Sequence, residues 1–532
     1  MQRRDFVRLG LAAGMATGAS GLALAAPKKK TPARFAPEQI LEAGVQVQQQ
    51  AMRAGKLTAH GLATRYLARI EAVDRAGPRL RSVIELNPDA LETARERDRE
   101  RKAGKLRGPL HGIPVLLKDN IATGDKMSTS AGSLALDGVR AVRDAHLVAR
   151  LRTAGAVILG KTNLSEWANM RSVRSTSGWS ARGGQTRNPY ALDRNTSGSS
   201  SGSAAAMAAS LATLAVGTET DGSIVSPSAC CGIVGIKPTL GLVSRAGIIP
   251  IAHSQDTAGP MARSVADAAF LLGALAGPDP QDGVTAKAPR VNYASFLRKD
   301  GLRGKRLGVA RDFFGANDGV NALIEKELSL LREQGAILVD VAIPNRDRYG
   351  ETELTVLLHE FRPDLEAWLA AYAPHAPVKT MADIIDFNVR NAKQEMPYFG
   401  QEHLIAAQAK GGLEARDYIK ALANNRRYAR DKGIDQVMRD QKLDALVAPT
   451  GGPAWLIDYI NGDHYGASFS SPAAVAGYPH ITVPAGLLHG LPVGLSFVGK
   501  AWSEPALIAM AYAYEQAGRR RRAPTYTAHI RV

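Results

Sequence analysis

Residues 197–239 read SGSSSGSAAAMAASLATLAVGTETDGSIVSPSACCGIVGIKPT. Two clusters of serine and glycine, one around Ser199 and one around Ser223, flank a single alanine-rich segment. Alanine is the strongest helix former, so we predict a helix over 203–216, loops on either side, and glycine-rich turns that continue to residue 235. A flexible loop without chemistry would not explain why two such clusters flank one helix. The stretch is therefore the first candidate for a functional site.

Predicted helices and short apolar runs alternate on both sides of this stretch. Strands are predicted at 82–86, 114–117, 156–159, 306–309, around 337, at 445–448 and at 481–483, with a strand pair and its turn at 492–498. Helices are predicted after the cap residue Thr58, over 89–105, 141–155, 262–277 and 318–334, and over most of 350–440. This alternation predicts an α/β fold in which helices cover both faces of a sheet. No long linker or low-complexity segment divides the chain, so we predict one large domain.

Composition excludes several classes of protein. The chain has 532 residues and a formal net charge of +17, but its positive residues are scattered, and Arg519–Arg522 follow a helix-like segment. We therefore predict no nucleic-acid site. The two cysteines, Cys230 and Cys231, are adjacent, and adjacent cysteines form a disulfide only with strain. The histidines are few and form no H-E-x-x-H motif. We expect no metal and no cofactor.

The N-terminus has the pattern of an export signal. Arg3-Arg4 precede an apolar, small-residue stretch that ends in Ala23-Leu24-Ala25. A positive start, a modest apolar region and small residues at the cleavage point predict a signal peptide, here of the twin-arginine type. We predict a signal at 1–25, a basic lead-in at 26–36, a periplasmic location, and no stable membrane insertion after cleavage. The alternative, a membrane anchor, is disfavoured because the stretch is short and contains several glycines and serines.

Two short motifs match known patterns without the context that those patterns need. Residues 155–162 (GAVILGKT) match the phosphate-binding loop, but their interior is apolar and β-prone and predicts a strand. Residues 198–202 (GSSSG) match the nucleophile elbow of α/β-hydrolases, which requires a strand directly before it. The preceding residues 193–197 are polar and turn-forming, so we interpret this match as accidental.

The run 197–239 resembles the amidase signature, whose core is G-G-S-S-G-G…G-T-D-x-G-G-S-I-R-x-P…G-x-K-P-T. Further blocks agree with it in the family's order: 111–120 (HGIPVLLKDN), 160–169 (GKTNLSEWAN), 256–261 (DTAGPM) and 490–495 (GLPVGL). The resemblance covers an amidase domain at 37–532, with the signature core at about 110–275 and a variable helical region at about 280–440. It implies a single domain with a central mixed β-sheet, hydrolysis of amides, and a small amide or an amidated peptide as substrate.

Carried over by position, the resemblance assigns three catalytic residues. Ser223 takes the place of the nucleophile, Ser199 that of a bridging serine which in the family follows a cis peptide bond, and Lys118 that of the general base. Thr220, Asp221, Gly222 and Ser223 fall in the segment whose backbone N–H groups form the oxyanion hole. No histidine stands in a matching block.

The chemistry makes a specific demand on the lysine. A serine hydroxyl is a weak nucleophile until a base takes its proton, and lysine is a base only when neutral. The ordinary lysine pKa is ~10.4, so burial must lower it. Lys118 ends a predicted apolar strand, which would supply that burial; the alternative is an ion pair with Asp119 or another carboxylate. Ser199 would pass protons between Lys118 and Ser223, and water would release the acyl group as a carboxylate after ammonia or an amine has left.

Departures from the signature bear on the substrate. Ser197 and Ser201 stand where glycines are common, and Asp221 replaces a small residue. The variant 218–223 (TETDGS), together with 177–188 (SGWSARGGQTRN) and LSEWAN, resembles the peptide-amidase branch, which removes C-terminal amides from peptides. Three other residues of the signature blocks are interpreted as structural: His111, Glu166 and Asp256.

Other functions remain open at this stage. The same catalytic residues could serve an aliphatic-amide hydrolase, or an esterase or lipid-amide hydrolase. A component of a tRNA-dependent amidotransferase is disfavoured by the export signal, because tRNA is cytoplasmic. A binding protein that lost catalysis is disfavoured by the intact set Lys118, Ser199 and Ser223. The sequence does not give the oligomeric state.

Overall fold

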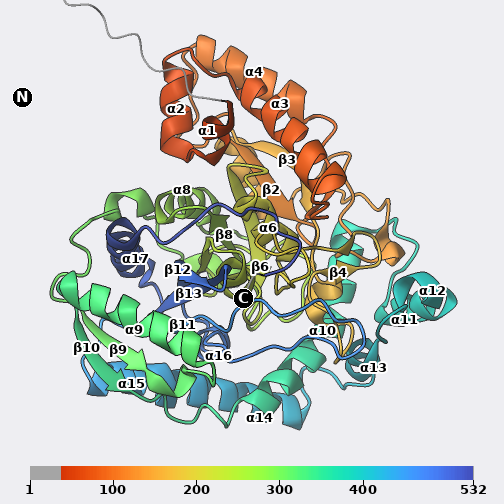
Figure 1. Ribbon diagram of the computed structural model, residues 1–532. Helices are drawn as coiled ribbons and strands as arrows, with labels where there is room; N and C mark the ends of the chain where they lie inside the picture. The colour runs from red at the N-terminus through yellow and green to blue at the C-terminus, as the bar shows by residue number, and fades with distance from the viewer. Residues whose placement is uncertain (1–36, 531–532) are drawn as a thin grey trace, which may run out of the picture.

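The computed structural model describes residues 37–530 (Figure 1). The signal peptide predicted at 1–25 and the basic lead-in at 26–36 lie outside the described residues. Within 37–530, no helix combines the length and the apolarity that crossing a membrane requires.

One eleven-stranded sheet runs through the molecule in the order β1-β3-β2-β6-β8-β7-β12-β13-β11-β9-β10. Its strands are β1 (Val83–Leu86), β2 (Pro114–Lys118), β3 (Val157–Thr162), β6 (Leu214–Glu219), β7 (Val234–Lys237), β8 (Thr257–Ala262), β9 (Arg306–Ala310), β10 (Ile337–Val341), β11 (Ala445–Pro449), β12 (His480–Leu488) and β13 (Leu491–Val498). The pairs β2–β3, β2–β6, β9–β10 and β9–β11 are parallel, whereas the strands between these two groups pair antiparallel. The mixed sheet and the single large domain are confirmed.

Helices pack on both faces of the sheet, as predicted. In one group, α6 (Ser201–Ala208) lies against β2, β3, β6 and β8, and α7 (Val225–Cys230) lies against β7, β12 and β13. In the other group, α8 (Val265–Leu275), α9 (Asp318–Glu333) and α17 (Glu504–Gly518) pack against the sheet, and α17 contacts both α8 and α9. Figure 1 shows the N-terminal helices gathered beyond β2 and β3. They are α1 (Pro37–Glu42), α2 (Val45–Arg53), α3 (Ala59–Arg69) and α4 (Ala90–Lys102).

The variable region predicted at 280–440 is mainly helical after β10, and in Figure 1 these helices run from the right edge along the bottom to the lower left. Its helices are α10 (Gly350–Tyr372), α11 (Met381–Arg390), α12 (Ala392–Glu395), α13 (Glu402–Gln408), α14 (Arg416–Asn425) and α15 (Asp435–Asp440). The first turn of α10 reaches the signature core, because Glu353 accepts a hydrogen bond from Gln255 Nε2 at 2.8 Å. The variable region therefore lies next to the segment around Thr220, because Gln255 Nε2 also donates to the Thr220 carbonyl oxygen at 3.3 Å.

The helix predicted over 203–216 is wrong in its second half. The helix α6 ends at Ala208, the chain turns through Ser210 with φ 56°, and Leu214-Ala215-Val216 begin β6. Every residue of β6 is buried, so the strand shows no alternation of apolar and polar residues. A short apolar run of this kind cannot be distinguished from a buried helix by periodicity.

The strand pair predicted at 492–498 is also wrong, because this segment is the single strand β13. It pairs antiparallel with β12, and the turn lies earlier, at His489-Gly490, closed by the pair Leu488–Leu491. His489 and Gly490 have φ of 50° and 82°, which is the conformation of a two-residue hairpin turn whose twist matches the strands. The strands β7 and β8 and the helix α7 were missed within segments rich in glycine and proline.

Candidate active site

Lys118 lies at the carboxyl end of β2, beside the carboxyl end of the parallel strand β6. The side chain is fully buried. Its Nζ lies 2.7 Å from Ser199 Oγ, 2.9 Å from Thr218 Oγ1 and 3.3 Å from the Thr218 carbonyl oxygen. The alternative ion pair with Asp119 is not formed, since Asp119 instead accepts hydrogen bonds from Ser130 and Arg182. The structure therefore brings Lys118 and Ser199 together as the sequence predicted.

Burial lowers the pKa of Lys118 to about 7, against the smaller opposing effects of the negative charges of Asp256 and Glu219. Removing an ammonium group from water disfavours its charged form, and no carboxylate lies close enough to restore it fully. A lysine with this pKa is substantially neutral near pH 7. The amine can therefore accept a proton, which is the property that the sequence argument required.

Ser199 follows a cis peptide bond between Gly198 and Ser199, the feature that the resemblance implies at this position. The next residue joins the two serine clusters, because the Ser200 backbone N–H donates to the Ser223 carbonyl oxygen at 3.1 Å. Ser199 is completely buried, whereas Ser223 keeps an exposed fraction of 7%. Ser223 is therefore the more accessible of the two serines, whereas Ser199 contacts Lys118.

The turn that carries Ser223 is held by the carboxylate of Glu219. Its Oε2 accepts hydrogen bonds from the backbone N–H groups of Ile224 at 2.7 Å and Val225 at 3.0 Å. Gly222 has φ 79°, a left-handed conformation that glycine adopts without strain. This conformation turns the chain sharply just before Ser223.

The predicted oxyanion hole lies within the same turn. Within 37–530, the backbone N–H groups of Thr220, Asp221, Gly222 and Ser223 donate no hydrogen bond to another protein group. Backbone donors that are fixed in position but unpaired can bind the negative oxygen that develops on a carbonyl under attack. The turn thus offers the donor groups that the resemblance assigned.

Ser200, which the elbow-like motif 198–202 would make a nucleophile, is not free to attack. It is completely buried. Its hydroxyl donates to the Thr218 carbonyl oxygen at 3.0 Å and accepts from the Thr218 N–H at 3.2 Å. No strand directly precedes the motif, as expected for an accidental match. The phosphate-loop match is likewise confirmed as a strand, since its Lys161 is in β3 and its buried amine donates to Ile121 O and Ser128 O.

Asp256 has a structural position next to the catalytic turn. Its carboxylate accepts from Thr220 Oγ1 at 2.5 Å, from the Ile251 N–H at 2.8 Å and from the Ala252 N–H at 3.0 Å. Burial raises the pKa of Asp256 to about 6. The side chain therefore holds the loop that precedes β8 against the turn.

The other two signature-block residues interpreted as structural also make structural contacts. The His111 ring is buried and its Nε2 lies 2.9 Å from Arg97 O. Glu166 forms a fully buried ion pair with Arg171 at 2.6 Å. Neither contact involves Lys118, Ser199 or Ser223.

Sequence reasoning missed three residues that arrange the site. Thr218 presents its hydroxyl and carbonyl oxygens to Lys118, and Asn120 Nδ2 donates to the same hydroxyl at 3.0 Å. Glu219 holds the turn of Ser223. All three residues lie within the quoted signature blocks, so the sequence could have pointed to them. The directions of their side chains could not be predicted, because they depend on the parallel pairing of β2 with β6.

Asp221, the departure from the signature nearest to Ser223, lies beside Glu353 of the variable region. Burial raises the pKa of Asp221, and the hydroxyls of Ser470 and Ser471 oppose that rise. Burial and the neighbouring Asp221 raise the pKa of Glu353 well above its usual range. Two neighbouring buried carboxyl groups each disfavour the ionised form of the other, so both pKa values are raised, and that of Glu353 is raised well above its usual range.

Comparison with known proteins settles the family. A family model described as Amidase matches residues 62–508. The chain belongs to the amidase family. It is a hydrolase that acts on amide C–N bonds.

This amidase is similar in sequence to the following three proteins, two of which have solved structures. The crystal structure of native peptide amidase from Stenotrophomonas maltophilia is 56% identical and superposes with a TM-score of 0.88, covering 91% of this chain and 99% of that one. A probable amidase of Arabidopsis thaliana is 43% identical over 502 residues, 92% of each chain. An amidase family protein from Bacillus anthracis is more distant, at 38% identity and a TM-score of 0.84, covering 92% of this chain and 93% of that one.

Proposed function

We propose that this amidase removes the C-terminal amide from peptides, with Ser223 as nucleophile, Ser199 as proton relay and Lys118 as general base. The observation that carries the mechanism is the 2.7 Å contact between the Lys118 amine and Ser199 Oγ, in a buried setting that lowers the pKa of Lys118 to about 7. The peptide-amide substrate is supported by the 56% identity to a peptide amidase over nearly its whole length.

The reaction begins with proton transfer away from Ser223. Neutral Lys118 accepts the proton of Ser199, Ser199 takes that of Ser223, and the Ser223 oxygen attacks the amide carbon. The carbonyl oxygen becomes negative and is stabilised by backbone N–H groups of residues 220–223, each donor contributing about 3 kcal/mol to the transition state. The protons then return through Ser199 to the nitrogen, ammonia leaves, and an acyl group remains on Ser223.

Water completes the cycle by the same path. Lys118 and Ser199 remove a proton from a water molecule, which attacks the acyl ester, and Ser223 leaves with its proton restored. The products are ammonia and a peptide with a free carboxylate. No histidine takes part in this scheme.

The test measures hydrolysis of four matched compounds. Ammonia release is measured for an amidated dipeptide and a simple aliphatic amide, with the same dipeptide as free acid serving as the blank, and acid release is measured for an ester of the dipeptide. The proposal predicts the highest kcat/KM for the amidated dipeptide, and its loss in Ser223→Ala and Lys118→Ala. Turnover of only the aliphatic amide or the ester would keep the mechanism and reject the peptide substrate. Ammonia release that survives Ser223→Ala would reject the assigned nucleophile.

A further inference from the structure

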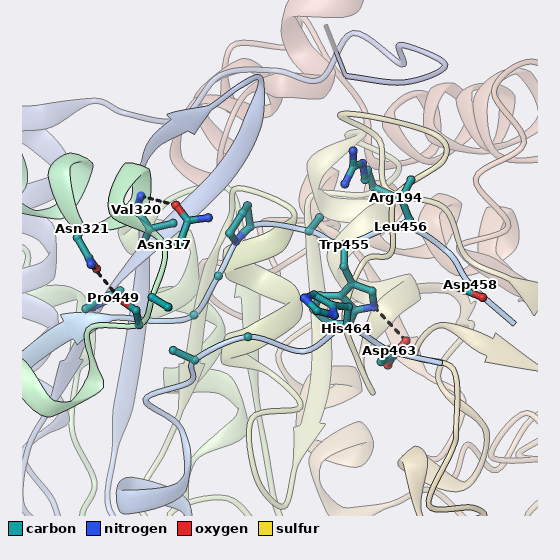
Figure 2. Close-up of a pocket in the computed structure, with 18 of the residues that line it drawn as sticks. Arg194, Asn317, Val320, Asn321, Pro449, Trp455, Leu456, Asp458, Asp463 and His464 are labelled. Carbon is teal, nitrogen blue, oxygen red and sulfur yellow. Dashed lines mark hydrogen bonds between the residues drawn. The ribbon is translucent and has the colours of Figure 1, made fainter. Parts of the chain in front are cut away.

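A cavity of about 860 Å³ lies between residues 313–321 and residues 449–467 (Figure 2). Its apolar walls include Phe313, Val320, Pro449 and Trp455. This volume is in the range of sites that bind small organic ligands. None of Lys118, Ser199 and Ser223 lines the cavity, so it is separate from the catalytic residues themselves.

The segment 465–470 connects this cavity to the catalytic turn. Tyr465 Oη donates to Ser226 Oγ at 3.2 Å, and Ser470 Oγ lies 3.1 Å from the point where a Cβ on Gly222 would stand. Of the four residues between them, Gly466 and Ala467 line the cavity. One short segment thus has the turn of Ser223 on one side and the cavity on the other.

Two aromatic side chains in contact, Tyr465 and Trp455, lead from the turn of Ser223 to the cavity. The Trp455 ring meets the Tyr465 ring edge-on at 5.4 Å between centroids, and Tyr465 is 50% exposed. Trp455 is held in place by its Nε1–H, which donates to Asp463 Oδ1 at 3.0 Å, a bond drawn in Figure 2. A group bound at Ser223 that extends past Tyr465 would meet the indole of Trp455 next.

Part of the cavity lining is glycine backbone, from Gly451, Gly452 and Gly466. Gly451 pairs with Ser468 in an isolated antiparallel bridge, and beyond it Gly452 and Gly466 make no backbone hydrogen bond within 37–530. A Cβ built on Gly452 would have no neighbour closer than 4.0 Å. Unpaired backbone N–H and C=O groups next to an apolar wall are the features that bind an extended peptide independently of its sequence.

We propose that this cavity binds the residues of an amidated peptide that precede the scissile amide, with peptide backbone along Gly452 and Gly466 and an apolar or aromatic side chain against Trp455. The inference rests on the proposed function and names where the acyl part of that substrate lies. The site selects for peptides of more than one residue, because a single amino-acid amide would occupy the region of Ser223 without reaching Trp455.

The test compares an N-acetyl amino-acid amide with an amidated tetrapeptide that has the same C-terminal residue and an aromatic residue upstream. The measured quantity is the ratio of the kcat/KM value for the tetrapeptide amide to that for the amino-acid amide, both for ammonia release. In Gly452→Leu the added side chain occupies the cavity, and the open surroundings of Gly452 allow it without disturbing the fold. We expect the ratio of tetrapeptide to amino-acid amide to fall at least about tenfold, a loss comparable to that of one good apolar contact.

The matched control is Gly283→Leu, at a glycine that also has no atom within 4 Å of its Cβ position and does not line the cavity. It should leave the ratio unchanged, and Trp455→Ala should lower it. A ratio unchanged in Gly452→Leu, or a kcat/KM that falls equally for both substrates, would overturn the cavity assignment while leaving the proposed function intact. A wild-type protein that hydrolyses neither amide would overturn the proposed function and this inference with it.

Discussion

Thr218 presents two acceptors to the amine of Lys118, its hydroxyl oxygen at 2.9 Å and its carbonyl oxygen at 3.3 Å. A neutral amine has two N–H groups and one lone pair. If Thr218 takes both N–H groups, the lone pair remains for the Ser199 hydroxyl at 2.7 Å. Thr218 thus orients the amine of Lys118, the proposed base, as well as contacting it.

This relationship predicts that Thr218→Val lowers kcat about 10- to 100-fold, because the lone pair of the base is then less well directed at Ser199. The variant also removes a hydrogen bond to the charged amine, so the apparent pKa of kcat/KM should fall. Thr218→Ser keeps the hydroxyl and should restore both values. Equal losses in Thr218→Val and Thr218→Ser, without a shift in the pH profile, would assign Thr218 a packing role only.

The lowered pKa of Lys118 predicts how activity depends on pH. The general base must be neutral, so kcat/KM should rise tenfold per pH unit below about 7 and level off above it. Asp256 favours the charged amine, and Asp256→Asn should therefore move the midpoint to lower pH. The measurement is ammonia release between pH 5 and pH 9, with unfolding followed in parallel. A midpoint that does not move in Asp256→Asn, or activity that falls as pH rises through 7, contradicts the role of Lys118.

The carboxyl pair of Asp221 and Glu353 predicts a dependence of stability on pH. Because the pKa of Glu353 is raised in the folded protein, the folded state keeps a proton that the unfolded state releases above about 4.5. The free energy of unfolding should therefore decrease as pH rises above that value. Glu353→Gln keeps a hydrogen-bond donor and removes the ionisation, so it should flatten this decrease.

Glu353→Ala is the contrasting variant. It leaves Asp221 without its partner carboxyl group, and an unpaired buried polar group costs about 1–3 kcal/mol. The melting temperature at pH 8 should fall in Glu353→Ala and not in Glu353→Gln. A free energy of unfolding that falls with pH as steeply in Glu353→Gln as in the wild-type protein would show that Glu353 does not retain its proton in the folded state.

The predicted export signal is tested by cell fractionation. In a bacterium with twin-arginine export, the full chain should appear in the periplasm, shortened by about the 25 residues of the predicted signal. Substitution of Arg3 and Arg4 by lysine should retain it in the cytoplasm. Periplasmic accumulation that is unaffected by this change would reject the twin-arginine assignment.

The sequence predicted the parts of this protein in which local chemistry decides the structure. The apolar run before Lys118 became β2, and the β-prone interior of 155–162 became β3 instead of a phosphate loop. Thr58 caps α3, as its hydroxyl accepts from the Gly61 N–H. In each case the residue type and its immediate neighbours in the sequence suffice to predict the element.

The remaining features depend on tertiary pairing. Leu214–Val216 is a strand only because β2 and β8 flank it, and the turn of the β12–β13 hairpin is fixed by the register of Leu488 against Leu491. The same applies to the site: the serines and the lysine were identified from motifs, whereas the orienting roles of Thr218 and Asn120 follow from the side-by-side ends of β2 and β6. The partnership of Asp221 with Glu353 joins residues 132 positions apart (353 − 221) and has no local signal.

The proposed mechanism requires Ser223 to carry the acyl group. This can be measured by mass spectrometry of the protein mixed with a nitrophenyl ester of an N-acylated dipeptide, quenched in acid after a few turnovers and digested to map the adduct. We expect an acyl adduct on the peptide that contains Ser223, and no adduct in Ser223→Ala. An adduct on Ser200 or Ser199 in the wild-type protein, or turnover of the ester without any covalent adduct under conditions in which deacylation is slow, would contradict it.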